Sequence, residues 1–104
     1  MPSATYKLIR SAMERKQQIT CLYQGYTREI CPHSIGLGKA NEEKTLGFQF
    51  AGGSSKGLPV GGQWRCMDVN GMFDVRARDG DWHSGGFHTR PQTCVKLIDL
   101  EVID

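Results

Sequence analysis

After residue 17 the chain offers only short runs of alternating or β-branched residues, separated by glycine, proline and Asn-Gly signals. Runs of this length with regular turn signals are typical of a small sandwich or barrel rather than a helical bundle. With 104 residues there is room for one hydrophobic core and not for two. We therefore expect a single domain over residues 1–104.

Residues 5–17 predict one helix in front of this β region. The apolar positions gather on one helical face, whereas the other side is charged: Leu8, Ile9, Ala12 and Met13. Ser3 or Thr5 is the expected N-cap. A lone helix this short is marginal in water, so we expect it to cover an open end of the β structure.

The remaining chain, residues 18–103, predicts five or six strands and gives a mainly β (α+β) fold class. The first two strands are expected at 19–23 and 27–31, joined by a turn at 24–26, and Pro32 is expected to end the second one. The later strands are expected at 45–51, 64–69, 72–75 and 93–103, with Asn70-Gly71 as a two-residue hairpin turn. Residues 52–62 and 79–86 predict irregular loops.

Four cysteines are spread along the chain without a CxxC pair: Cys21, Cys31, Cys66 and Cys94. No apolar run reaches the length of a transmembrane helix, and the first residues lack a secretory signal. We therefore expect a cytoplasmic protein whose cysteines are reduced core residues. A zinc site or a Cys–His nucleophile built from Cys31 or Cys66 and the histidines His33, His83 and His88 is the alternative, but no known zinc spacing and no catalytic motif is present. We predict no metal, no cofactor and no enzymatic activity.

The net charge is +2, and the positive charge lies mainly in the first part of the chain. Residues 1–40 hold six Lys or Arg against two Glu, whereas residues 91–104 hold one Lys against three acids. This asymmetry permits an anion-binding face, although the balance is far from that of a strongly basic DNA-binding domain.

Four segments carry a resemblance to a known family: Ala12-Met13-Glu14-Arg15-Lys16, Ile19 to Tyr23, Arg28 to Gly36, and Trp64 to Val69. In this order, from residue 12 to about 75, the chain resembles the WYL domain, an SH3-like barrel module of bacterial regulators, as a divergent stand-alone version. The family's Trp-Tyr-Leu triplet falls near Lys44-Thr45-Leu46, where only Leu46 survives, and its later arginine falls in Asn70-Gly71. The resemblance implies a small SH3-like barrel with a ligand-sensing role, contacting nucleic acid or nucleotide-like ligands through basic and aromatic side chains.

Arg28 and Arg65 are the first candidates for a binding site, because two guanidinium groups on adjacent strands can clamp a phosphate or carboxylate. The alternative is that each is solvated or pairs with Glu29, Asp68 or Asp74. Tyr23 and Tyr26 are the aromatic candidates, since stacking on an aromatic ring beside a basic group holds single-stranded nucleic acids. The favoured alternative is that these tyrosines and Trp64 are core residues, because a small barrel needs large side chains to fill it, and for Trp64 we expect a mainly structural role.

Two loops add further candidates. Residues 52–57 could form an anion nest with Lys56, although most such stretches are flexible connections. The segment 79–90 holds His83 and Arg90 among acids and aromatics, and binding residues concentrate in loops.

Together these features predict a regulatory module that binds a small ligand, a nucleotide or single-stranded nucleic acid, with no membrane partner. The predicted ligand-binding residues are Arg28, Arg65, Tyr23, Tyr26, Lys56, His83 and Arg90. The alternative is an interaction or oligomerisation domain that forms a homodimer or binds a protein partner through the apolar strand 93–103.

Overall fold

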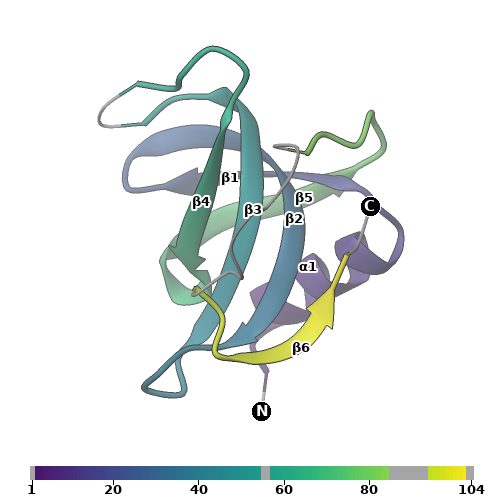
Figure 1. The fold of residues 1–104 in the computed structure, drawn as a ribbon, viewed down its shortest axis with the longest axis vertical. Coiled ribbons are helices and arrows are strands. Elements are labelled where there is room, and N and C mark those ends of the chain that lie inside the picture. Colours follow the sequence, from purple (N-terminus) through teal and green to yellow (C-terminus); the bar gives the residue numbers. More distant parts are fainter. Residues whose placement is uncertain (1, 55–56, 85–93, 103–104) are drawn as a thin grey trace.

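The computed structural model describes residues 2–54, 57–84 and 94–102, and within them one N-terminal helix is followed by six antiparallel strands (Figure 1). The predicted mainly β, α+β class is therefore confirmed. In chain order the elements are α1 (Ala4–Glu14), β1 (Gln18–Tyr23), β2 (Tyr26–Leu37), β3 (Glu43–Gly52), β4 (Gln63–Asp68), the single 3₁₀ turn η1 (Val69–Gly71), β5 (Met72–Arg78) and β6 (Leu97–Glu101).

The strands form one curved sheet in the order β4-β3-β2-β1-β5, and β6 pairs with β2 outside this path. β2 is long enough to have two successive partners. Its first half pairs with β1, from Tyr26 to Ile30, and its second half pairs with β6, from Ser34 to Leu37. In Figure 1, β1 and β5 cross behind the other strands, and α1 lies near the end of the sheet where β6 runs.

Helix α1 begins where its N-cap was expected. The Ser3 hydroxyl accepts a hydrogen bond from the Tyr6 amide at 3.1 Å, which satisfies one of the amides left over at a helix start. The helix ends at Glu14, earlier than predicted, because Lys16 takes a left-handed conformation (φ 49°) and the Gln17 amide bonds back to the Ala12 carbonyl.

The core lies between α1 and the concave side of the sheet. Its fully buried members come from the helix, four strands and η1, and they are chiefly long aliphatic side chains that fill the interior of a small β structure. The list includes Ile9, Met13, Ile19, Ile30, Ile35, Met67 and Val69.

β2 does not end at Pro32, so that prediction is wrong. Pro32 pairs with Gly47 on the β3 side, and the β2–β3 register shifts just after it. On the other side of β2, the β1 pairing stops at Ile30 and the β6 pairing starts at Ser34. Pro32 therefore lies in the gap between two partners, where its missing N–H removes no ladder bond on that side.

Asn70-Gly71 does not form a β-hairpin either. β4 pairs with β3 and β5 pairs with β1, and η1 joins them. The buried Val69 side chain anchors this turn in the core. Gly71 serves close packing, because a Cβ there would lie 3.1 Å from the Tyr23 ring. Because β4 is paired with β3 and β5 is paired with β1, the two strands that flank Asn70-Gly71 do not pair with each other.

The last strand is held to the helix by one carboxylate. Asp99 accepts hydrogen bonds from the Tyr6 hydroxyl at 2.6 Å and from Arg10 Nε at 3.0 Å. Both bonds lower the pKa of Asp99 because they favour the ionised carboxyl group. The bond from Tyr6 has the larger effect and the bond from Arg10 the smaller one. Burial and the bond to Asp99 raise the pKa of Tyr6.

The cysteines divide into two kinds. Cys21 and Cys31 are buried thiols, as predicted, and burial raises the pKa of Cys21 to about 11. Cys66 and Cys94 are joined in a disulfide, so the prediction of four reduced cysteines is wrong for this pair. Cys66 lies exposed on β4 and not in the core, which leaves its sulfur open to a partner from the C-terminal segment.

Candidate anion-binding site

Two arginines converge on one amide oxygen in the middle of the sheet. Arg28 lies on β2, Gln49 on β3 and Arg65 on β4, so three neighbouring strands each supply one side chain. Gln49 Oε1 accepts a hydrogen bond from an Arg28 terminal nitrogen at 3.3 Å and another from Arg65 Nε at 3.1 Å. The sheet therefore brings together the two arginines that the sequence singled out.

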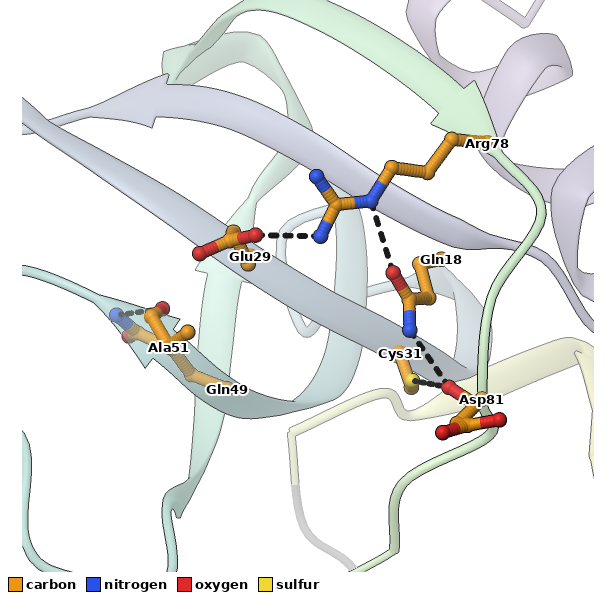
Figure 2. A network of polar contacts seen from close by, with 7 residues as sticks. All are labelled: Gln18, Glu29, Cys31, Gln49, Ala51, Arg78 and Asp81. Carbon is orange, nitrogen blue, oxygen red and sulfur yellow. Dashed lines mark hydrogen bonds and ion pairs between the residues drawn. The ribbon is translucent and has the colours of Figure 1, made fainter.

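Gln49 is held so that its oxygen faces the arginines. Its side chain is completely buried, and its Nε2 donates hydrogen bonds to the carbonyls of Ala51 and Gly53, both at 3.1 Å. Figure 2 shows the amide turned toward Ala51 on the same strand. Since both amide hydrogens are used, the carbonyl oxygen is fixed as a shared acceptor.

The other contacts of Arg28 are also with neutral groups. Its Nε donates to the Tyr23 carbonyl at 3.4 Å, and a terminal nitrogen donates to Gln24 Oε1 at 3.5 Å. The guanidinium lies 5.2 Å from the centre of the Tyr23 ring, a cation–π distance. Only 3% of Arg28 is exposed, so a full positive charge is buried among neutral acceptors.

Arg65 is partly buried and reaches the loop after β3. One of its terminal nitrogens donates to the Ser54 hydroxyl at 3.1 Å, and that hydroxyl donates in turn to the Gly57 carbonyl at 2.6 Å. Burial lowers the pKa of Arg65, and the positive charge of Arg28 lowers it further. Both effects disfavour the charged form, which is the opposite of what a carboxylate neighbour would do.

The acids that could have neutralised these arginines are bound to other cations. Glu29 pairs with Arg78, Asp68 with Lys44, and Asp74 with Arg76. Figure 2 shows Arg78 directed at Glu29 and Gln18. In residues 2–54, 57–84 and 94–102 no ion pair includes Arg28 or Arg65. The alternative of ordinary surface ion pairs with Glu29, Asp68 or Asp74 is therefore wrong.

The two predicted tyrosines lie near this site in different roles. Tyr23 is 9% exposed and belongs to the core, where its ring lies beside Arg28 and its hydroxyl accepts from the Asp68 amide. Tyr26 is 39% exposed, and its ring lies over Gly53, where a Cβ would be 3.1 Å away. Tyr26 is thus an exposed aromatic ring beside Gly53, whose carbonyl accepts a hydrogen bond from Gln49.

Of the remaining predicted ligand-binding residues, His83 is the one that lies within the described residues. Lys56 and Arg90 lie outside the described residues. The His83 ring stacks on Phe50 with centroids 4.2 Å apart, and its amide donates to Cys31 Sγ at 3.2 Å. Trp64 is half-buried and contacts the rings of Phe48 and His33, as expected for a structural tryptophan.

Gln49, Ser54 and Gln24 were missed by sequence reasoning. The signal for Gln49 was present, because one amide interrupts the apolar run Leu46 to Phe50. A polar side chain at a buried strand position needs partners, and its partners turned out to be the arginines. In the described part of the chain no three metal-ligating side chains gather.

Comparisons of the chain with protein-family models, with curated proteins and with solved structures found no match. Among the described residues no helix has the length and apolar character needed to cross a membrane.

Proposed function

We propose that this chain is a ligand-sensing module that binds a phosphate-bearing ligand, a nucleotide or single-stranded nucleic acid, between Arg28 and Arg65. The observation that carries the proposal is the pair of guanidinium groups on Gln49 Oε1, without a carboxylate in ion-pair contact among the described residues. Buried charges are normally paired. An anion would supply the missing negative charge.

The chemistry of the site favours phosphate over other ligands. Guanidinium groups present planar forks of N–H donors that match phosphate and carboxylate oxygens. Several donors of Arg65 have no contact with Gln49 or Ser54. The exposed Tyr26 ring beside Gly53 offers a surface on which a base can stack.

We further propose that the sheet is an SH3-like barrel related to the WYL domain. The strand order β4-β3-β2-β1-β5 supports this, since a four-strand meander is followed by a one-turn 3₁₀ helix and a fifth strand that returns to β1. The core enclosed by the curved sheet and α1 supports it as well. The family relation itself stays a prediction.

The test is a titration of the purified protein with ADP, ATP and labelled single-stranded DNA and RNA at low and moderate salt. Arg65→Gln removes one guanidinium without emptying the core. Arg76→Gln is the matched control, because Arg76 is 75% exposed and its ion pair is with Asp74. We expect binding that weakens with salt and falls roughly tenfold or more in Arg65→Gln, the worth of a charged hydrogen bond.

Equal binding by the wild type, Arg65→Gln and Arg76→Gln would contradict the assignment of the site. Failure of the wild type to bind any of these ligands at low salt would contradict the proposed function. Circular dichroism of the two variants reports whether the fold is retained.

A second candidate function is an interaction or oligomerisation domain acting through the C-terminal strand. Leu97 is 61% exposed and Ile98 48% exposed on β6, and exposed apolar strands are sites of pairing between chains. Light scattering over a hundredfold concentration range tests it, and a constant monomer mass would contradict self-association.

The cytoplasmic location stays a prediction. The disulfide between Cys66 and Cys94 points the other way, because such bonds persist more readily in oxidising compartments. Fractionation of cells that produce the protein, with alkylation of free thiols at lysis, would decide the location and the redox state together.

A further inference from the structure

The Cys66–Cys94 disulfide fixes the start of the C-terminal segment to the sheet. Cys66 lies on β4, an outer strand of the sheet path, and Cys94 lies just before the residues that run into β6. The two cysteines are separated by 28 positions. The bond therefore joins β4 to a segment that would otherwise reach it only through non-covalent contacts.

The residues after Cys94 lie in a close-fitting position on β2. Val95 is 2% exposed, and the Lys96 amide donates to the Leu37 carbonyl at 2.9 Å. Gly36 makes this approach possible, since a Cβ there would lie 2.0 Å from the Leu97 carbonyl oxygen and 2.8 Å from Val95. The segment 94–97 is thus placed by the disulfide at one end and by the bare backbone of Gly36 at the other.

We propose that the Cys66–Cys94 disulfide is a redox-sensitive clamp whose reduction releases the C-terminal strand, residues 94–102, from the second half of β2. The released strand uncovers the β2 edge from Ser34 to Leu37, which β6 otherwise pairs. This device is independent of the anion site and of the function proposed for it.

The chemistry is a two-electron thiol–disulfide exchange with a dithiol reductant. A reductant thiolate attacks Cys66 Sγ, because Cys66 is exposed whereas Cys94 is half-buried. A mixed disulfide forms and the Cys94 thiolate leaves and takes up a proton. The second thiolate of the reductant then attacks the reductant sulfur that is bonded to Cys66. This step releases Cys66 as a thiolate and leaves the reductant as a cyclic disulfide.

The surroundings of the Cys94 sulfur suit a reversible change. Cys94 Sγ lies 3.6 Å from the Thr45 carbonyl oxygen, so the reduced thiol finds an acceptor where it already stands. The two other cysteines do not interfere, because Cys21 and Cys31 are buried and buried thiols react slowly.

After reduction the segment keeps its pairing with β2, the buried Val95 and a small number of polar contacts. Asp99 is bound to Tyr6 and Arg10, and the Val102 amide donates to the His33 carbonyl. β6 itself is five residues long and largely exposed. Segments with few buried contacts open locally before the domain unfolds, so reduction is expected to loosen this strand and to leave the β1–β2 hairpin intact.

Hydrogen exchange measured by mass spectrometry on the oxidised and dithiothreitol-reduced protein tests the clamp. In the reduced protein we expect amide protection in residues 33–37 and 95–102 to fall at least about tenfold below that of residues 19–30, because the released strand opens locally whereas residues 19–30 exchange only when the whole domain unfolds. The Cys66→Ser/Cys94→Ser variant is the control. It should exchange like the reduced protein and should not respond to dithiothreitol.

Two results would overturn the proposal. Unchanged exchange in residues 33–37 and 95–102 would mean that the disulfide does not hold the strand. Equal protection of residues 33–37, 95–102 and 19–30 in the reduced protein would mean that the bond stabilises the domain globally and clamps no particular segment.

Discussion

Removal of the Cys66–Cys94 disulfide should cost a large part of the stability of this small domain. The bond spans 28 positions of sequence, and the loop-closure entropy of a ring of that size in the unfolded chain corresponds to about 3.5 kcal/mol at 25 °C. Small domains have unfolding free energies of roughly 5–15 kcal/mol. For a chain of about 100 residues the loss corresponds to a fall in Tm of roughly 15–25 °C.

Urea and thermal unfolding of the oxidised wild type and of Cys66→Ser/Cys94→Ser measure this loss directly. Addition of dithiothreitol should bring the wild type to the stability of the double variant and should leave the double variant unchanged. A loss below about 1 kcal/mol would refute the reasoning from chain entropy. Alkylation of the unreduced, denatured protein should modify two thiols, Cys21 and Cys31, and modification of four would show that the disulfide is not formed.

Three further substitutions test the packing and electrostatics. Gly36→Ala should destabilise the protein by roughly 1–3 kcal/mol, because the new Cβ would meet the Leu97 carbonyl at 2.0 Å; urea unfolding measures it, and an unchanged midpoint would contradict the close approach. Ile30→Ala should lower the free energy of unfolding by about 2–5 kcal/mol, since Ile30 is fully buried. Leu22→Ala on the exposed face should lower it by roughly 0.5 kcal/mol or less. Similar losses in the urea unfolding of both variants would contradict the assigned core. The hydrogen bonds from α1 lower the pKa of Asp99. The ionised Asp99 therefore stabilises the folded protein above the ordinary carboxyl pKa, and this stabilisation is lost as the pH falls through the lowered pKa. Asp99→Asn should reduce the dependence of stability on pH on the acid side by at most about 1 kcal/mol, because the carboxylate is 41% exposed, and identical stability curves of the variant and the wild type between pH 2 and 7 would contradict this link.

Local patterns predicted much of the fold. The apolar spacing of α1 with its Ser3 cap and the alternation around Gln24-Gly25 depend on neighbouring residues, and both elements appear close to their expected places. The errors come from pairing that local sequence does not specify. Pro32 is tolerated because two partners of β2 meet there. Asn70-Gly71 forms no hairpin because β5 pairs with β1.

The candidate site was predicted in part for the same reason. Arg28 and Arg65 were expected on adjacent strands, and this expectation is wrong, because β3 lies between β2 and β4. The two side chains nevertheless reach a common acceptor on that middle strand. The role of Gln49 depends on the strand between them. Within the described part of the chain, Arg28 and Arg65 have no ion pair because Glu29 and Asp68 pair with other cations. Such long-range choices of partner leave no mark in the local sequence. The Cys66–Cys94 pairing is another example.

The central claim is that Arg28 and Arg65 hold an anion between them, and NMR of the arginine Nε–H groups tests it most directly. Titration of ¹⁵N-labelled protein with ADP should shift the Nε–H signals of Arg28 and Arg65 together, saturably, while the signal of the exposed Arg76 stays in place. Assignment follows from the Arg65→Gln and Arg76→Gln variants. Unmoved signals of Arg28 and Arg65 at saturating ADP, or shifts that appear first at Arg76, would contradict the account.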